Sequence, residues 1–327
     1  MPPAKQPTWR QRGEYVAFRL FEGTCRLLPV GLGIRLARGL AWVLCHLLPR
    51  KLTRYDIAQA NLQTAFGDQL TAADRDRIIY DMWVHLLRLL QEVCQIQSRL
   101  HLRNSLDIVE ITNREDVLRN LLSDRPVIFL SGHYGNWEVA VQILGLFGFK
   151  MGVVARRLDN PLLDRWFEQF RERHNHELID KTGGATRMTE ILEQGGCLCM
   201  LGDQDAGRQG KFVDFFGKPA STHRAIALLA LRYDAVILVG GARRLENPNR
   251  DWVGFEQFCE AVIDPRTLTS DDPEREILEL YHAALERIIR RAPEQYFWVH
   301  KRWKSEPGQK RKRTPKPATD LTSVENP

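Results

Sequence analysis

The sequence predicts an α/β fold, with a mostly parallel central sheet flanked by helices and an N-terminal helical segment that associates with a membrane. First, short β-branched runs alternate with helical patterns from about residue 102 onward, as in parallel α/β domains. Second, the first hundred residues carry apolar side chains at helical spacing. Third, residues 1–55 hold ten Lys/Arg and two acidic residues, whereas the whole chain has a net charge of only +6. We therefore expect a basic helical region at 1–100, an α/β domain at 101–305 and a disordered basic tail at 306–327.

Residues 15–49 are the most apolar long stretch, and the segment 27–48 within it predicts an amphipathic helix lying in a membrane interface. Arg35 and Arg38 interrupt it on one face, which makes a bilayer-spanning helix costly. No cleavage site typical of a signal peptide follows. A helical cap packed on the core is the alternative. The basic charge suits an anionic membrane surface or a polyanionic partner, or is simply a solvated face.

The remaining elements follow from caps and periodicity. Thr71 caps a helix at 72–92, Asn160-Pro161 begins a helix that ends near 174, and Asp272-Pro273 begins one that ends at 291. Further helices are expected at 186–194 and 222–233, and strands at 127–130, 151–155, 178–179, 197–201 and 235–240, with an alternating segment at 252–260.

The stretch VIFLSGHYGNWE, residues 127–138, predicts a buried strand, a tight turn and the start of a helix capped by Asn136. His133 and Glu138 are five residues apart, so they converge only if the backbone bends between them, as Gly132 and Gly135 permit. A carboxylate that orients an imidazole is the arrangement of a general base. A histidine in a turn beside a helix-capping acid is the plain alternative.

Asp203-Gln204-Asp205 follows another buried strand, and Arg156 ends a neighbouring one. Two carboxylates there are costly to bury unless paired, so we expect Arg156 as their partner. These groups would hold the site, bind a polar substrate group, or merely close a loop. Phe212, Phe215 and Phe216 would form an apolar wall, either plain core or an acyl-chain channel.

Several classes of site are not supported by the sequence. It contains neither a G-x-S-x-G nucleophile elbow nor a phosphate-binding P-loop. The six cysteines lack zinc-ligand spacing, and Cys197 and Cys199 are read as core residues in a reducing compartment. His174 and His176 have no converging partners in the sequence, so no metal site is expected.

Taken together, four ordered segments resemble the late acyltransferases of lipid A biosynthesis, of the lysophospholipid acyltransferase-like superfamily. SGHYGNWE is similar to the H-x4-(D/E) signature of this family. VVARRLDNPLLD, LGDQDAGRQGKFVDFFGKPASTH and APEQYFWVHKRWK are similar to three further blocks, over residues 61–304. The chain departs from the family pattern at Arg157, where proline is usual, and in a shorter, arginine-interrupted N-terminal segment.

The resemblance implies a glycerolipid acyltransferase-like fold and O-acyl transfer at the cytoplasmic face of a bacterial inner membrane. His133 would deprotonate an acceptor hydroxyl, Glu138 would orient the imidazole, and Asn136, Arg156, Asp203, Gln204 and Asp205 would bind substrate. The donor would be a thioester of acyl carrier protein or coenzyme A, with no metal or tightly bound cofactor. The implied partners are a glycolipid acceptor, anionic membrane lipid and acyl carrier protein, with no nucleic acid. Another glycolipid or a lysophospholipid as acceptor, a hydrolase, and an inactive lipid- or carrier-binding module remain alternatives.

Overall fold

The centre of the molecule is a seven-stranded sheet with the strand order β1-β9-β8-β2-β5-β3-β4. The computed structural model describes residues 6–246 and 252–308. Neighbouring strands are parallel except β8 and β9, which are antiparallel, so the predicted mostly parallel sheet is confirmed. The strands are β1 Val109–Thr112, β2 Val127–Ser131, β3 Gly152–Ala155, β4 Glu177–Asp180, β5 Cys197–Leu201, β8 Val236–Leu245 and β9 Gly254–Ile263.

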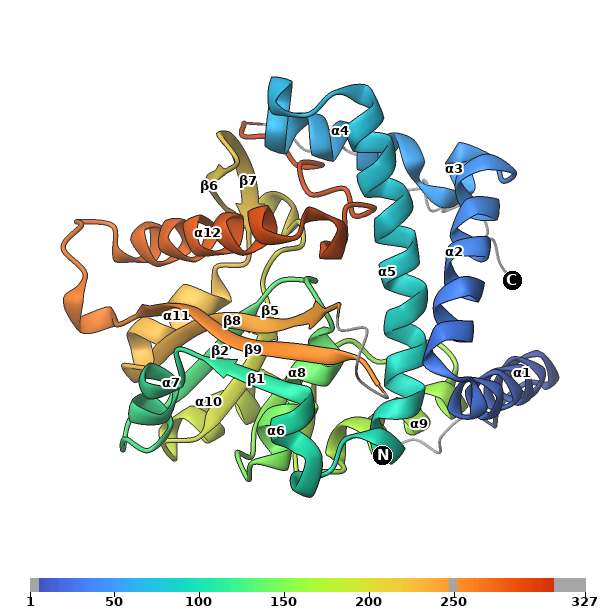
Figure 1. Ribbon diagram of the computed structural model, residues 1–327. Coiled ribbons are helices and arrows are strands. Elements are labelled where there is room, and N and C mark those ends of the chain that lie inside the picture. The colour runs from blue at the N-terminus through green and yellow to red at the C-terminus, as the bar shows by residue number, and fades with distance from the viewer. Residues whose placement is uncertain (1–5, 247–251, 309–327) are drawn as a thin grey trace, which may run out of the picture.

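Helices cover both faces of this sheet, as Figure 1 shows, with α12 on one face and α7 and α8 on the other. Residues at the middle of the sheet are fully buried, including Ile128, Leu198 and Ile237. The helices of this domain are α6 Ser105–Ile108, α7 Arg114–Leu121, α8 Trp137–Leu146, α9 Pro161–Glu172, α10 Ala185–Glu193, α11 Ala225–Tyr233 and α12 Pro273–Arg291. Short 3-10 turns lie at Gly67–Gln69, Leu102–Asn104, Gly207–Gln209, Pro265–Thr267 and Pro293–Gln295.

The helix starts predicted from capping residues are largely confirmed. Thr71, Asn136, Asn160 and Asp272 each accept a hydrogen bond from a backbone N–H of the helix that follows. Thr222 was expected to open a helix, and this prediction is wrong. It ends β7, because residues 211–222 form an unpredicted hairpin of β6 Lys211–Phe215 and β7 Lys218–Thr222, with Phe215 and Ala220 fully buried.

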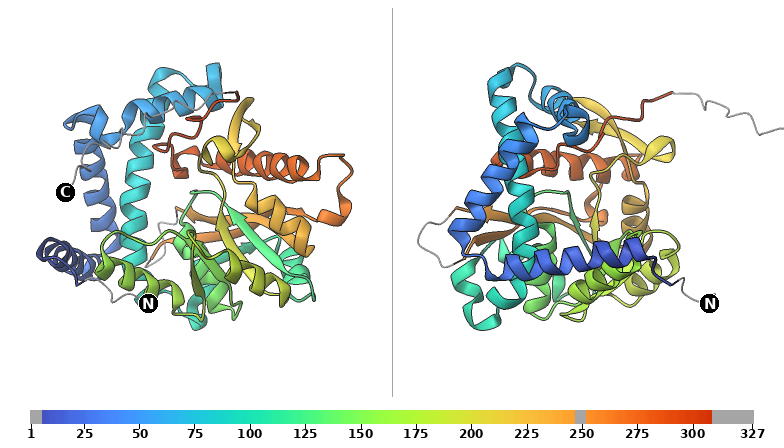
Figure 2. Two further views of the ribbon diagram at one scale, coloured as in Figure 1. Left: turned by 180° about the vertical axis from the view of Figure 1, so that it is seen from behind. Right: turned by 90° about the vertical axis from the view of Figure 1, so that its right-hand side faces the viewer.

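The N-terminal helices form a layer outside the long helix α5. Their bounds are α1 Trp9–Leu27, α2 Val30–His46, α3 Arg50–Thr53, α4 Tyr55–Phe66 and α5 Ala72–Arg99. Helix α5, which is longer than predicted, lies between the sheet domain and α2 (Figures 1 and 2). The amide of Gln95 on α5 donates to the carbonyl oxygens of Cys25 at 2.7 Å and Leu28 at 3.0 Å. No helix in the described part of the chain is long and apolar enough to cross a bilayer.

This outer layer carries much of the exposed apolar surface. Twelve of the 21 exposed large apolar side chains identified among the described residues fall between Trp9 and Leu52. On α2 the small residues Gly33, Ala37 and Ala41 are buried, whereas Leu32, Leu36 and Leu40 are exposed. Spacing of four residues places each set on one helix face. We call the exposed set, Leu32, Leu36, Leu40, Trp42, Leu47, Leu48 and Leu52, the N-terminal apolar face.

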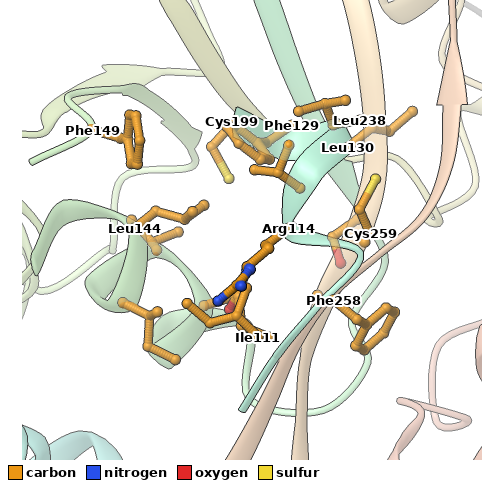
Figure 3. A pocket seen from close by; sticks show the side chains of 18 of the residues that line it. Ile111, Arg114, Phe129, Leu130, Leu144, Phe149, Cys199, Leu238, Phe258 and Cys259 are labelled. Carbon is orange, nitrogen blue, oxygen red and sulfur yellow. The ribbon is translucent and has the colours of Figure 1, made fainter. Parts of the chain in front are cut away.

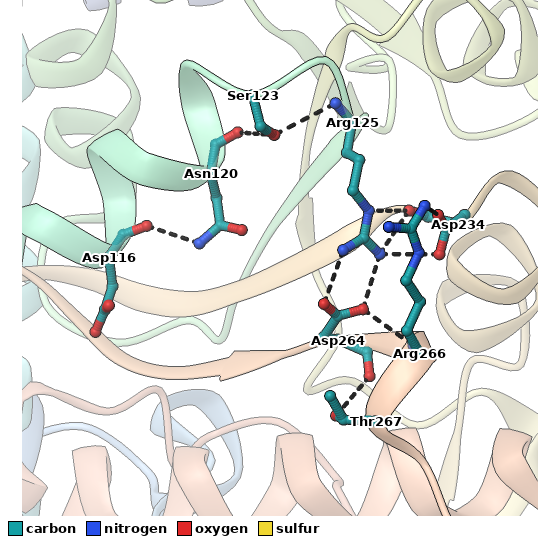
Figure 4. Close-up of polar contacts among 8 residues, drawn as sticks. All are labelled: Asp116, Asn120, Ser123, Arg125, Asp234, Asp264, Arg266 and Thr267. Atoms are coloured by element: carbon teal, nitrogen blue, oxygen red, sulfur yellow. Dashed lines mark hydrogen bonds and ion pairs between the residues drawn. The ribbon is translucent and has the colours of Figure 1, made fainter.

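A cluster of charged residues closes the sheet at the amino end of β2, as Figure 4 shows. The guanidinium of Arg125 donates to both oxygens of Asp264, at 2.7 and 2.8 Å, and to Asp234 Oδ1 at 2.9 Å. These residues precede β2, follow β9 and precede β8, respectively. The cluster therefore ties three strands together at the edge of the sheet where β2 and β8 begin and β9 ends. The predicted disordered tail at 306–327 lies almost entirely outside the described residues, which end at 308.

Candidate active site

The loop between β2 and α8 bends sharply at the carboxyl edge of the sheet. Asn136 caps α8 by accepting a hydrogen bond from the Val139 backbone N–H at 3.1 Å. Gly135 adopts a φ of +58°, and a Cβ atom there would lie 2.1 Å from the carbonyl oxygen of Ala242. Only glycine fits both constraints. The predicted strand–turn–helix is thus confirmed, and it exposes His133 at the turn.

His133 is held by Asp203, which follows the adjacent strand β5. Its Nδ1 lies 2.7 Å from Asp203 Oδ1, and its backbone N–H donates to Oδ2 at 2.8 Å. Strands β2 and β5 are parallel neighbours in which Ser131 faces Leu201, so the two loops leave the sheet at the same level. A carboxylate at Nδ1 places the proton of the neutral ring there, which leaves Nε2 free to accept one. This is the tautomer of a general base.

The charges of this pair move both pKa values. Burial alone would lower the pKa of His133, but the charge and hydrogen bond of Asp203, together with the charge of Glu138, raise it above its ordinary 6.5. Burial would raise the pKa of Asp203, but the charge and hydrogen bonds of His133 and the charge of Arg302 lower it to about 2. Asp203 is therefore ionised throughout the neutral range, and His133 is a stronger base than a free imidazole.

The sequence interpretation missed two residues near the pair: Arg302 lowers the pKa of Asp203 through its charge, and Tyr281 holds the end of β2. Arg302 is only 2% exposed and donates to Ser221 O at 2.6 Å and Thr222 Oγ1 at 2.9 Å. Tyr281 on α12 donates to the carbonyl oxygen of Ser131 at 2.9 Å. Arg302 lies in the aromatic and basic segment 292–304 that carried part of the family resemblance. Tyr281 has no signal beyond its place on the buried face of a helix.

Glu138 does not occupy the position expected for it. Its carboxylate accepts two hydrogen bonds from Arg171 on α9, at 2.6 and 3.0 Å. The predicted contact of Glu138 with the imidazole is thus made by Asp203 instead. Glu138 acts on His133 through its charge, and its place in catalysis stays a prediction. Nothing in the sequence pointed to Arg171.

The expected partnership of Arg156 with Asp203 and Asp205 is wrong. The Arg156 side chain is 78% exposed and pairs with Asp159 at 3.2 Å. Although β3 adjoins β5, Arg156 follows β3 at the outer rim of the site and its side chain turns to solvent. The buried partner of Asp203 is His133 and not Arg156.

The other predicted substrate-binding residues differ in their surroundings. The Gln204 amide lies 3.4 Å from His133 Nε2, where an acceptor hydroxyl would also have to come. Asp205 accepts hydrogen bonds from Ser305 Oγ at 3.0 Å and Gly207 N at 3.1 Å, which ties down the loop. Asn136 is fully buried, with its amide donating to Glu92 at 2.8 Å, a geometry that favours support of the loop over substrate contact.

An apolar cavity of about 390 Å³ approaches the site at Ser131 and Trp137, although His133 itself does not line it. Its lining includes Trp137, whose ring centroid is 5.1 Å from that of His133, and Ser131 beside it. Figure 3 shows Leu144 and Phe149 on one side and Phe258 and Cys259 on the other, with Arg114 extending between these walls. Phe215 and Phe216 do not line this cavity; they pack in the main core, so the plain-core alternative holds for them.

His176, one of the two histidines considered as metal ligands, has another role. His176 is buried and bonded to Val141 O at 3.0 Å and Met151 N at 3.2 Å. Across residues 6–246 and 252–308, no group of three or more His, Cys, Asp or Glu could hold a metal ion.

Comparison with known proteins gives a consistent family. Residues 15–305 match the model of the bacterial lipid A biosynthesis acyltransferases. A lipid A biosynthesis palmitoleoyltransferase from Escherichia coli is 26% identical over 259 residues, covering 78% of this chain and 80% of that protein. A phosphatidylinositol mannoside acyltransferase from Mycolicibacterium smegmatis is 30% identical over 42% of this chain and 45% of its own length.

A solved structure is also similar. The 1-acyl-sn-glycerophosphate acyltransferase PlsC from Thermotoga maritima aligns with 79% of this chain and 97% of its own, at 16% identity and a TM-score of 0.36. The family match, which spans most of the chain, includes the loops that carry His133 and Asp203. The chain is therefore an acyltransferase and belongs to the bacterial lipid A biosynthesis acyltransferase family.

Proposed function

We propose that the protein transfers a fatty acyl group from a thioester to a hydroxyl of a lipid A precursor, with His133 as general base. The observation that carries this proposal is the His133–Asp203 pair, whose Nε2 can accept a proton and whose imidazole contacts Trp137, a residue that lines the apolar cavity. A positioned base of this kind contributes about 10²–10⁴-fold to the rate of proton transfer reactions.

The reaction follows from the geometry of the imidazole. Nε2 takes the proton of the acceptor hydroxyl as its oxygen attacks the thioester carbonyl carbon. The tetrahedral intermediate then expels the thiolate, which receives the proton from the imidazolium. Asp203 stabilises the imidazolium by its charge, so direct transfer proceeds without an acyl-enzyme. Glu138, held by Arg171, adds a second negative charge nearby.

The cavity is suited to the acyl chain of the donor. Its walls are apolar along β2, β8 and α8, and Trp137 separates them from the imidazole. Each methylene group that moves from water into such a cavity gains roughly 0.8 kcal/mol. A chain lying in it would bring its thioester to the Ser131 and Trp137 end of the cavity, which is the end nearest His133.

A cationic group at the rim, Lys181, suits a phosphorylated acceptor. Lys181 follows β4, and its Nζ lies 3.4 Å from His223 Nε2. The charge of Lys181 acts to lower the pKa values of both His133 and His223, so it lies close to both rings. Arg187 and Lys211 each form a salt bridge with a carboxylate, to Glu177 and Asp272 respectively. Lys181 forms no such salt bridge with a carboxylate of the described residues. A phosphate of the acceptor headgroup would provide the missing counter-charge.

We further propose that the protein works at the cytoplasmic face of the inner membrane. The N-terminal apolar face lies among basic residues that include Arg35, Arg38 and Arg50. Apolar side chains flanked by cations suit an anionic lipid surface. The same positive charge would favour acidic acyl carrier protein as the donor, with coenzyme A as the alternative.

The test is a transfer assay on membranes that contain the protein or its His133→Ala variant. Labelled thioesters of acyl carrier protein or coenzyme A are supplied with a tetra-acylated lipid A precursor, and product mass is followed. We expect a product one acyl group heavier, lost in the variant by about 10³-fold or more. Transfer that persists in the variant would contradict His133 as the base. Thioester loss without an acceptor would indicate a hydrolase, and no reaction at all an inactive binding module.

A related glycolipid is the second candidate acceptor. The phosphatidylinositol mannoside acyltransferases among the relatives, at 30% and 32% identity, favour it over other lipids. In the same assay, transfer to such a mannoside or to a lysophospholipid, with none to the lipid A precursor, would keep the chemistry and change the substrate.

A further inference from the structure

The catalytic loop is held on two sides, and only one of them is Asp203. On the other side, Gly135 N–H donates to the carbonyl oxygen of Gln295 at 2.9 Å. Asn136 N–H donates to that of Ala242 at 2.8 Å. The Gly135 carbonyl oxygen lies 3.1 Å from His85 Nε2 on α5. Every polar backbone group named here is thus bound to a part of the chain remote in sequence.

A buried ion pair lies behind these contacts. Glu92 on α5 accepts from Arg244 Nε at 2.5 Å and Nη2 at 2.8 Å, with side chains only 5% and 3% exposed. The same carboxylate accepts from the amide of Asn136, the residue that caps α8. Arg244 Nη1 lies 2.6 Å from His85 Nδ1. Glu92, Arg244 and His85 thus form one connected set, which we call the loop support.

The chemistry of arginine fixes the proton on His85. A guanidinium only donates, so His85 Nδ1 must accept, and the proton of the neutral ring lies on Nε2. That N–H then donates to the Gly135 carbonyl oxygen. Burial and the charges of Arg244 and Arg88 hold the pKa of His85 well below 6.5, although the bond to Gly135 acts in the opposite direction. The ring therefore stays neutral, with Nδ1 accepting from Arg244 and Nε2 donating to Gly135.

We propose that Glu92, Arg244 and His85 are positioning residues of the transfer reaction, which hold the Gly135–Asn136 backbone so that His133 meets Asp203. Within the described residues none of the three forms a hydrogen bond or ion pair with His133; they act on it through the loop. The inference rests on the proposed function, because it assigns these residues to the same site. A displacement of about 1 Å at a reacting group can lower a rate by about 10²-fold.

The first test is Glu92→Gln, which keeps the size of the side chain and removes its charge. We expect kcat to fall by about 10–100-fold while KM for the acceptor changes less than about twofold. We also expect the pKa of His133, measured by NMR titration of the purified protein, to fall, because a loosened loop weakens the contact with Asp203.

Arg125→Met is the matched control, since it breaks a charged cluster at the opposite edge of the sheet (Figure 4). It should lower Tm and leave kcat and the pKa of His133 as in the wild type. If Glu92→Gln behaves in the same way, with Tm alone affected, these residues are merely structural and the inference is overturned.

His85→Phe is the second variant, because Glu92→Gln leaves a buried arginine without its counter-charge and can fail to fold. It keeps the Glu92–Arg244 ion pair but removes both bonds of the imidazole, to the Gly135 carbonyl oxygen and to Arg244 Nη1, and we expect the same fall in kcat and in the pKa of His133. An unchanged pKa of His133 in the folded variant would overturn the inference. The NMR titration needs no turnover, so an inactive wild-type protein would count against the proposed function alone.

Discussion

At the scale of single residues, the site depends on a carboxylate seventy positions away from its base. Asp203 binds both the ring and the backbone N–H of His133, so it fixes the rotamer and the tautomer together. Its own pKa of about 2 keeps it charged while the imidazole takes up a proton. A buried acid with no such partner would instead be neutral at pH 7.

Asp203→Asn should therefore change both the rate and its pH dependence. We expect kcat to fall by about 10²–10⁴-fold, because the imidazolium loses its counter-charge. The base must be unprotonated, so wild-type activity is lost as pH falls through the raised pKa of His133, above 6.5. In the variant, burial lowers that pKa and the acid limb moves to lower pH.

The measurement is a pH–rate profile, with Asp205→Asn as the control. Asp205 belongs to the same three-residue segment but bonds Ser305 and Gly207 rather than His133. It should leave the acid limb where it is in the wild type. An acid limb that does not move in Asp203→Asn would show that Asp203 does not set the basicity of His133.

The residues of the site were only partly predictable from the sequence. The glycines, the cap at Asn136 and the exposed turn at His133 follow from local chemistry, which the sequence carries directly. The partner of His133 does not, because it depends on β2 and β5 being neighbours, a fact of strand order. Glu138 was near in sequence and was preferred for that reason, and Arg156 was placed inward although its side chain turns to solvent.

At the scale of elements, α7 and α8 form with the sheet the cavity proposed for the acyl chain. Ser131 and Trp137 lie at its active-site end, whereas Val117 on α7 packs with Val127 and Val236 at the amino ends of β2 and β8. The cavity thus extends along the strands, away from the imidazole. The residues at its far end should limit the length of chain that fits.

Val117→Phe should shorten the preferred acyl chain by about two to four methylene groups, because a larger side chain fills the far end at about 0.8 kcal/mol lost per excluded methylene. The measurement is kcat/KM for a series of thioesters of increasing length. Leu121→Phe is the control, since Leu121 lies on the same helix and in the same apolar cluster but does not line the cavity. A preference that stays the same in Val117→Phe would place the acyl chain elsewhere.

The elements themselves were more predictable than the contacts between them. Helices with polar caps and buried strands were located because capping and periodicity are local signals. The β6–β7 hairpin was missed, since its strands pack aromatic residues against α12 and Trp298 rather than alternating cleanly. Strand β1 was missed as well; it has only four residues, and its ladder partner lies far along the chain.

At the scale of the whole molecule, α5 separates the sheet domain from the layer of α1 and α2 (Figure 1). Its His85 and Glu92 contact the catalytic loop, and its Tyr80 and Gln95 bond the backbone of α2 and α1. The sequence indicated an amphipathic helix at 27–48. It placed the start of this helix at Pro29, next to the first residue of α2, Val30, but it did not show the separate helix α1, which ends at Leu27.

Leu36→Glu combined with Leu40→Glu should weaken binding to anionic vesicles by at least about 10-fold. Each leucine that is replaced removes roughly 1.5 kcal/mol of free energy gained by burying its side chain in the lipid. Binding of the wild type should also weaken as salt is added, since cations flank the N-terminal apolar face. The measurement is co-sedimentation with phosphatidylglycerol vesicles. Leu280→Glu is the control, at an exposed leucine on α12. Equal binding by the double variant and the control would show that another surface meets the lipid.

The pairing of β1 with β9 also bears on how the chain is made. Val109 on β1 lies opposite Phe255 on β9. The first strand of the sheet to be synthesised therefore pairs only after the last strand has been made. Near the other end of the chain, Asn61 bonds the carbonyl oxygens of Trp298 and His300, and Arg302 supports Asp203. The active site is therefore completed only by the final residues of the domain. A nascent chain that stalls before Arg302 would be left without a working site, however much of its sheet had already formed.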